Sequence, residues 1–288
     1  MGKLSVHEQL NTISKLFLKR KELTNSLKLH MKILKVQLEI DNTSTKGTKV
    51  DWSDTKLMKD LEGRALKAKK PVIYFLDPSI FDSNVLYPPF KKIAKIFIER
   101  ETTEGSPGKF LNLINEKVNI IELIEATLRE NDSVITIYAE KLGVQPPLLL
   151  YITSALIQPL LEEIARKIDP SLYDKWWQAS CPICGRIPNV ARVRQRKRYL
   201  VCTFCGAEYL YDNFTCVHCE NKDPYTLKFL TIDGKPEFQV DFCVKCKHYI
   251  KVIDEEPLKD AIPKGLEDIM TLDLDLVANG EGLVRLSS

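Results

Sequence analysis

The chain has 288 residues, 44% of them hydrophobic, and a formal net charge of +3 at pH 7. This length suits one large domain or two ordinary ones, and so small a charge excludes a global basic field for nucleic acid or membranes. No apolar run reaches the roughly 18 residues that a membrane span needs. The start, MGKLSVHEQLNTISKLF, lacks the apolar core of a signal peptide. We therefore expect a cytoplasmic protein with no membrane span.

Apolar residues at helical spacing predict an all-helical bundle over residues 1–175. The clearest helix follows Pro146 and Pro147, and Pro159 should kink or split it. The segment KPVIYFLDP (70–78) is short, apolar and bounded by prolines, which predicts a buried extended piece. Apolar stripes of this kind are typical of helix faces that pack in a hydrophobic core, and they identify no catalytic or binding residues. One face of the clearest helix carries Leu149, Ile152, Leu156, Leu160, Ile164 and Ile168.

The cysteines mark a sharp change in composition. All eight lie between Cys181 and Cys246, as four Cys-x-x-Cys pairs, and the first 180 residues contain none. Short strands are expected at PNVARVRQ (188–195) and RYLVC (198–202), and YTLKFLTI-DG-KPEFQVDFC (225–243) predicts a hairpin with its turn at Asp233–Gly234. From 258 to 286 a helix returns, with Leu266, Ile269, Leu272 and Leu276 on one side.

These elements predict an α+β multidomain fold. The N-terminal helical bundle (1–175) is followed by tandem rubredoxin-like or zinc-ribbon modules of four cysteines each, at 176–212 and 213–254. A C-terminal helix in 255–288 is expected to pack on the ribbons or on the bundle.

Cysteine spacing predicts two metal sites. Seventeen residues separate Cys184 from Cys202, and twenty-three separate Cys219 from Cys243, where the hairpin accounts for the extra length. Sequential pairing is the simplest arrangement and interleaved pairing is the alternative. In the sequential arrangement, one ion takes Cys181, Cys184, Cys202 and Cys205, and the second takes Cys216, Cys219, Cys243 and Cys246.

Four thiolates close a tetrahedral site around zinc or a rubredoxin-type iron. No ligand position is left for water, so we expect no hydrolysis at the metal, no catalytic residues and no enzyme activity. Gly185 and Gly206, each directly after the second cysteine of a pair, permit the positive φ that such a tight turn often needs. His218 and His248 lie near ligands, but each site already has four sulfurs, so we interpret them as surface histidines.

Redox and disulfide readings of the cysteines fit less well. A thioredoxin-like dithiol needs a βαβ context and normally a single Cys-x-x-Cys. Disulfides do occur in hyperthermophile cytosol, yet four tandem pairs favour metal.

Alternating arginines raise the question of nucleic acid. Arg192, Arg194, Arg196 and Arg198 would share one face of a strand, as in a basic ribbon that contacts nucleic acid. Residues 181–250 carry 11 Lys/Arg and 7 Asp/Glu, an excess of four, whereas two divalent ions with eight thiolates carry 4 − 8 = −4. The metallated region is then close to neutral, which favours an acidic protein partner or a solvated face over nucleic acid.

Several stretches together resemble the FdhE family of formate dehydrogenase accessory proteins. They are CPICGRIPNVARV, RYLVCTFCGAEYLYDNFTCVHCENKD and FCVKCKHYIKVID, with EDIMTLDLDLVANGEGLVR (267–285) near the C-terminal end. More loosely, LKAKKPVIYFLDP resembles the family's Gly-Lys-Pro segment, and PPLLLYITSALIQPLLEEIA resembles the last helix of its bundle.

The resemblance implies an accessory or maturation factor. It would bind the catalytic subunit of formate dehydrogenase, or of a related molybdenum or tungsten oxidoreductase, and support its assembly. All eight cysteines would then be metal ligands in rubredoxin-like centres. Two alternatives stay open: a zinc-ribbon protein that binds nucleic acid, and a rubredoxin-like electron carrier. Neither the native metal, the client-binding surface nor the oligomeric state follows from the sequence.

Overall fold

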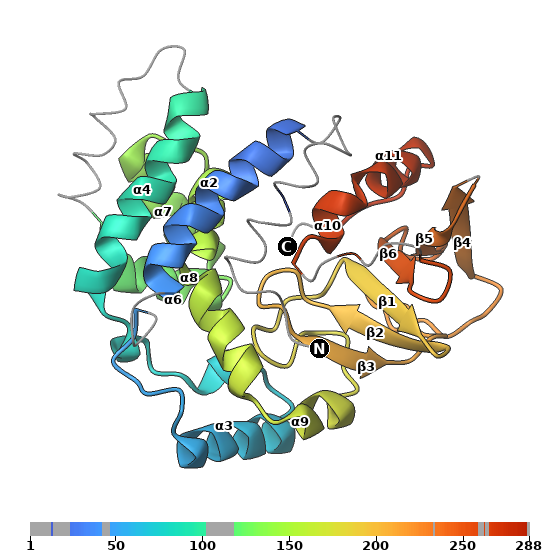
Figure 1. Ribbon diagram of the computed structural model, residues 1–288, viewed down its shortest axis with the longest axis horizontal. Coiled ribbons are helices and arrows are strands. Elements are labelled where there is room, and N and C mark those ends of the chain that lie inside the picture. Colours follow the sequence, from blue (N-terminus) through green and yellow to red (C-terminus); the bar gives the residue numbers. More distant parts are fainter. Residues whose placement is uncertain are drawn as a thin grey trace. The chain divides into compact units, whose positions relative to one another are not determined.

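The computed structural model describes residues 24–41, 47–101, 118–232, 234–258 and 265–286, with the single residues 13 and 262. These residues form helices and one six-stranded sheet (Figure 1). An α+β fold with zinc-ribbon-like four-cysteine modules is therefore confirmed, whereas the N-terminal bundle stays a prediction.

The chain divides into two compact units that do not follow chain order. One unit takes Lys56–Val72 and Ala165–Ser288, and the other takes Ser5–Thr55 and Ile73–Ile164. Helix α3 (Thr55–Ala68) thus belongs almost entirely to the unit that contains the sheet. The predicted domain limits at 175, 212 and 254 stay predictions.

Helices make up the described part of the unit without the sheet. Helix α8 begins at Pro146, as predicted, and its six predicted core positions are all at most 3% exposed. Pro159 lies inside the helix without splitting it, so that alternative is wrong. The elements are α2 (Thr24–Asp41), η2 (Val72–Phe75), η3 (Pro78–Ile80), α4 (Ser83–Glu101), α6 (Ile120–Leu128), α7 (Asp132–Leu142) and α8 (Pro146–Lys167).

Helix α8 is long and apolar enough to cross a membrane by length and composition alone. However, 61% of its most apolar window is buried inside the protein. Because the core helix of a soluble protein passes the same test, a single helix of this kind is weak evidence for a span.

The extended piece predicted at 70–78 is wrong. Val72–Phe75 and Pro78–Ile80 form two 3₁₀ turns instead. The side chain of Asp77 accepts a hydrogen bond from Ser79 N and caps the second turn. Among the described residues this segment pairs with no strand, so local capping decides its conformation.

The sheet has the strand order β3-β2-β1-β6-β5-β4. The two predicted short strands are confirmed as β1 and β2, which pair antiparallel, and the predicted hairpin is confirmed as β4 with β5. Gly234 has φ +75° in the second turn, and Asp233 lies outside the described residues. The strands are β1 (Val190–Arg194), β2 (Lys197–Val201), β3 (Glu208–Tyr211), β4 (Leu227–Ile232), β5 (Lys235–Cys243) and β6 (Tyr249–Asp254).

The two predicted ribbons share this one sheet. Strand β1 of the first pairs in parallel with β6 of the second, with Val190 opposite Lys251 and Val193 opposite Asp254. The backbone of Lys251 also donates to Asn189 O at 3.0 Å. A continuous hydrogen-bonded ladder therefore joins the two four-cysteine modules.

The C-terminal segment is two short helices, not one helix over 258–286. Helices α10 (Glu267–Met270) and α11 (Leu272–Gly280) are separated at Thr271, whose φ of −118° interrupts the helix. This break changes which residues face the sheet: Leu274 and Ala278 are fully buried, whereas Leu276 is 74% exposed. The predicted single apolar side is therefore wrong.

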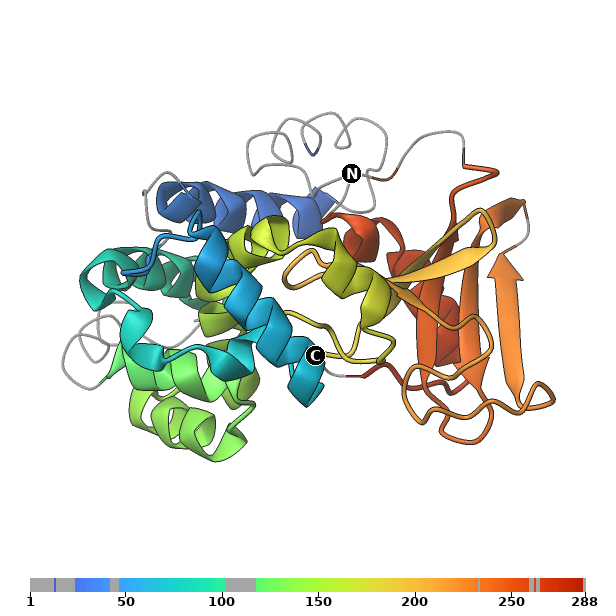
Figure 2. The same ribbon diagram turned by 90° about the horizontal axis from the view of Figure 1, so that it is seen from below.

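Helix α11 packs along the sheet (Figures 1 and 2). Leu274 and Ala278 form a core cluster with Val240 of β5 and Tyr249 of β6. The C-terminal helix therefore packs on the second ribbon, one of the two surfaces predicted for it.

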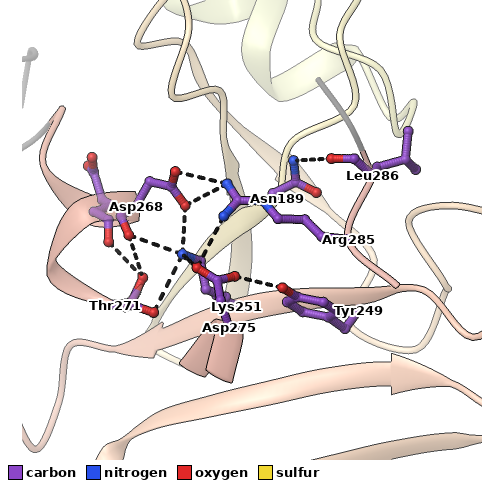
Figure 3. Close-up of polar contacts among 9 residues, drawn as sticks. Asn189, Tyr249, Lys251, Asp268, Thr271, Asp275, Arg285 and Leu286 are labelled. Carbon is purple, nitrogen blue, oxygen red and sulfur yellow. Dashed lines mark hydrogen bonds and ion pairs between the residues drawn. The ribbon is translucent and has the colours of Figure 1, made fainter. Parts of the chain in front are cut away.

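A buried group of charges fastens the same segment to β6 (Figure 3). Lys251, which is fully buried, lies 2.6 Å from Asp268 Oδ1 and 2.8 Å from Asp275 Oδ2. Arg285 contacts the same carboxylates at 2.7 and 3.1 Å, and Tyr249 donates to Asp275 at 2.7 Å. Two cations thus balance two carboxylates. Burial alone would raise the pKa of Asp268, but Lys251 and Arg285 hold it below its usual value.

Candidate metal centres

The eight cysteines lie in two groups of four, in the sequential arrangement. Within each group all Sγ atoms lie within 4.8 Å of one another. Four thiolates about 2.3 Å from a zinc ion would lie about 3.8 Å apart. The second group has Sγ–Sγ distances of 3.7 Å (Cys216–Cys246) and 3.8 Å (Cys219–Cys243), and the first has two of 3.4 Å. The donors therefore fit a four-thiolate metal ion, and all eight cysteines are free thiols.

All four Cys-x-x-Cys pairs use the same backbone turn. In each, the residue after the second cysteine has positive φ, between 56° and 80°, and donates its N–H to the carbonyl of the first cysteine at 2.8–3.0 Å. The backbone N–H of the first cysteine donates in turn to the carbonyl of the residue that follows the positive-φ residue, at 2.8–3.1 Å. The positive-φ residues are Gly185, Gly206, Glu220 and Lys247.

In the sequence, a glycine at the positive-φ position indicates only two of these four turns. Gly185 and Gly206 were expected to take positive φ and do so. Glu220 and Lys247 take it without the help of glycine, although side chains generally disfavour it. The tight turn that brings two thiols together therefore imposes this conformation in the second site.

The two sites differ in exposure. All four cysteines of the first site are buried, whereas in the second Cys219 is exposed and Cys246 is half-buried. Burial raises the pKa of the Cys181 and Cys205 thiols. Because metal ligation requires thiolates, binding at the first site must release protons.

Groups around the first site brace it. Val72 N donates to Pro182 O at 2.8 Å, within the first turn. A Cβ at Gly185 would lie 3.1 Å from Pro71 Cγ, so this glycine also permits close packing. Tyr209 is 1% exposed and donates to Ala179 O at 2.7 Å. The Lys-Pro segment at 70–71, which carried no chemistry in the sequence, therefore supports a metal turn.

His218 and His248 are not simple surface residues. Both are half-buried, and their rings lie 4.9 Å apart between centroids. Burial lowers the pKa of His218 to about 4, and its Nε2 lies 3.2 Å from Tyr249 O. The surface interpretation is wrong because the second four-cysteine group brings the Cys216–Cys219 turn and the Cys243–Cys246 turn together.

The four arginines do not share one face. Gln195 and Arg196 form the turn between β1 and β2, both with positive φ. Arg198 lies opposite Val193, whereas Arg192 lies opposite Tyr199. Since opposed residues of an antiparallel pair share a face, Arg198 projects to the other side from Arg192 and Arg194. The two-residue turn breaks the alternation.

Three of these arginines are held in ion pairs. Arg192 is 3% exposed and contacts Glu255 at 2.5 Å and Glu267 at 2.9 Å. Arg194 pairs with Glu208. Arg198 is 4% exposed and donates to the carbonyls of Asp212 and Thr215, in the segment that connects the two modules. The expected exposed basic face is therefore wrong.

Replacing Arg198 with methionine should lower the free energy of unfolding by about 2 kcal/mol, because two carbonyls lose their donor. Arg196→Met is the matched control: its side chain lies exposed in the turn, and its loss should cost less than about 0.5 kcal/mol. Urea unfolding of the metal-loaded protein measures both. Equal losses would show that Arg198 does not clamp the connecting segment.

Two four-cysteine clusters on a shared sheet define a metal-binding protein with zinc-ribbon-like modules. No family model matches the chain. It is 27% identical over 214 residues to an FdhE homologue of Aquifex aeolicus, covering 73% of this chain and 72% of that protein. An FdhE homologue of Stutzerimonas stutzeri is 31% identical over 147 residues, or 49% of this chain and 47% of its own length.

The fold agrees with that of a solved relative. The crystal structure of the FdhE protein from Pseudomonas aeruginosa superposes with a TM-score of 0.62 over 99% of this chain and 93% of that one, at 18% identity. At this identity the likeness is one of fold. Together with the sequence relatives it supports an assignment of the chain to the FdhE family.

Proposed function

We propose that this protein is an accessory factor that binds the catalytic subunit of formate dehydrogenase, or of a related molybdenum or tungsten oxidoreductase, and supports its assembly. Similarity in sequence and fold to FdhE proteins is the observation that carries the proposal. The role is one of assembly and not of catalysis, since four thiols at each centre leave no ligand position for a substrate.

The metal sites are structural in this proposal, and all eight cysteines are ligands. Each set of four holds one zinc or iron ion and fixes the turns that connect the strands. The cysteine-rich sheet presents a surface that the client meets. Eight free thiols suit the reducing cytoplasm, where we place the protein.

A rubredoxin-like electron carrier is the second candidate, and the exposed Cys219 favours it. Such a centre exchanges electrons through an exposed ligand when the metal is iron. Metal analysis separates the two roles, because rubredoxin-type iron is red and reversibly reducible whereas zinc is colourless.

Capture from the native host tests the leading proposal. A tagged full-length chain should co-purify with the oxidoreductase catalytic subunit, and a tag-only strain should not. Deleting the gene should abolish formate dehydrogenase activity and leave the subunit's transcript level unchanged. Recovery of RNA with no oxidoreductase subunit would contradict the proposal.

A further inference from the structure

A groove of about 630 Å³ lies beside the second metal site, within the unit that contains the sheet. Its volume falls within the range of about 300–1,000 Å³ that is usual for ligand sites. The lining comes from the turn and start of β2, the segment that connects the modules, the end of the Cys216–Cys219 turn and the residue after Trp176. It includes Trp177, Arg196, Lys197, Phe214, Glu220 and Lys222.

Two aromatic side chains stand exposed in this groove. Trp177 is 57% exposed and Phe214 is 73% exposed. Trp177 has φ +49°, an uncommon conformation for a bulky residue, while the adjacent Trp176 is 4% exposed and donates to Ser180 O at 2.5 Å. The chain therefore buries one tryptophan and holds the next one outward.

Phe214 is held in place by its neighbours. Its N–H donates to Asp212 Oδ1 at 3.0 Å, and Thr215 donates to the other oxygen of that carboxylate at 2.7 Å. Arg198 fixes the carbonyls on both sides of Phe214. These hydrogen bonds fix the backbone on both sides of Phe214, which lowers the entropy cost of ordering this segment on binding.

The charges at the rim are mostly positive. Arg196, Lys197 and Lys222 are exposed, and no ion pair involves them among the residues that the structure describes. Two carboxylates of the lining, Asp212 and Glu220, oppose these three cations, and Asp212 also accepts hydrogen bonds from Phe214 N and Thr215 Oγ1. Carboxylates of a partner therefore complement this rim.

A nucleic acid is a poorer match. Three exposed cations supply few phosphate contacts, and the carboxylates of Asp212 and Glu220 oppose them. Cys216 and Cys219 belong to the adjacent four-thiolate site, which with a divalent ion carries a net charge of 2 − 4 = −2. This fixed negative charge weakens attraction for a polyanion more than for a peptide with one or two carboxylates.

We propose that this groove is the docking site for a short client segment in which a bulky apolar side chain is flanked by carboxylates. The inference rests on the proposed function, because the segment belongs to the client. The apolar side chain packs against Trp177 and Phe214, and the carboxylates meet Arg196, Lys197 and Lys222.

Paired variants of the full-length, metal-loaded chain test the docking site. Phe214→Ala with Lys222→Glu changes the groove. Tyr225→Ala with Lys228→Glu changes an equally exposed aromatic residue and lysine of the same module that are absent from the groove lining. The groove variant should capture at least tenfold less catalytic subunit from the native host than wild type, and the control should stay within twofold. Unchanged metal content and circular dichroism establish that both variants fold.

A binding assay with purified protein tests the chemistry separately. The probes are fluorescein-labelled peptides of alternating glutamate and leucine or of lysine and leucine, and oligothymidylate. The glutamate–leucine peptide should bind best, and the groove variant should weaken it about tenfold.

The outcomes separate the two proposals. Equal capture by wild type and groove variant overturns the docking site and leaves the proposed function standing. Capture of no subunit by wild type overturns the proposed function, and the peptide assay then decides the groove alone. Preference for oligothymidylate or the lysine peptide, or no binding of any probe, overturns the groove's assigned chemistry.

Discussion

Removing metal from both four-cysteine sites will unfold the six-stranded sheet and spare the helices of the other unit. Structural zinc is worth about 10–16 kcal/mol in zinc-finger peptides at pH 7, as much as the whole stability of a typical domain. Here three of the four turns that carry the thiols lie between consecutive strands, and the thiols of the first site are part of the core. Without metal, four buried thiols crowd together and no longer hold these turns.

Hydrogen exchange with and without chelator measures this effect. Amides of β1–β6 should lose protection, while those of α6, α7 and α8 keep it. Circular dichroism should lose strand signal and retain helix. A sheet that stays protected after complete metal loss, checked by elemental analysis, would show that the metals are dispensable for folding.

The order of loss follows from exposure. A chelator should reach the second site first, since Cys219 is exposed and Cys246 half-buried, whereas the first site is fully buried. Metal release should therefore have two phases. Cys219→Ser should remove the fast phase. Simultaneous release of metal from both sites in the wild type would show that the difference in exposure does not set the order of release.

Lys251→Met should lower the free energy of unfolding by about 3–5 kcal/mol, the usual cost of breaking a buried ion pair by removing one partner. Lys251 is fully buried, and its loss leaves Asp268 and Asp275 with Arg285 as their remaining cation in the cluster. Urea unfolding measures the loss, and hydrogen exchange should show the first effect in α11, which this cluster fastens to β6.

Lys235→Met is the matched control. Lys235 also pairs with an aspartate, Asp273, at 2.7 Å, but the two side chains are 43% and 32% exposed. This loss should stay below about 1 kcal/mol. Comparable losses in the two variants would mean that burial of Lys251 does not matter.

The same cluster sets a response to acid. Lys251 and Arg285 lower the pKa of Asp268, so its contribution to stability is present above its unfolded pKa and is lost as pH falls through the folded value. In Lys251→Met only Arg285 remains to lower the pKa of Asp268, so the folded pKa is depressed less. The stability that this carboxylate still contributes should therefore be lost at a higher pH than in the wild type.

Cysteine spacing was enough to predict the two metal groups, because a Cys-x-x-Cys turn is a local structure that the chain cannot avoid if both thiols face one ion. The strands of both hairpins were equally local. The family resemblance came from the same stretches, and the comparisons support it. The α8 stripe was predictable because its period reports a buried face directly.

The sequence pattern did not predict the positions of the arginine side chains correctly. Alternation placed four side chains on one face, but Gln195 and Arg196 form a turn, so Arg198 projects opposite to Arg192. The partners of these arginines lie up to 75 residues away in sequence. Spacing alone could not show that two of them are buried.

The sequence by itself determined what is local: two sets of four thiols, the hairpins, and the apolar stripe of α8. Only the tertiary structure decided what depends on contacts between distant segments. The parallel pairing of β1 with β6 merges the two modules into one sheet, and the second four-cysteine group brings His218 beside His248. Other long-range contacts place Lys251 under α11 and the exposed aromatics at a basic rim. These contacts depend on the topology of the chain, which the periodicity of residues along the sequence does not determine.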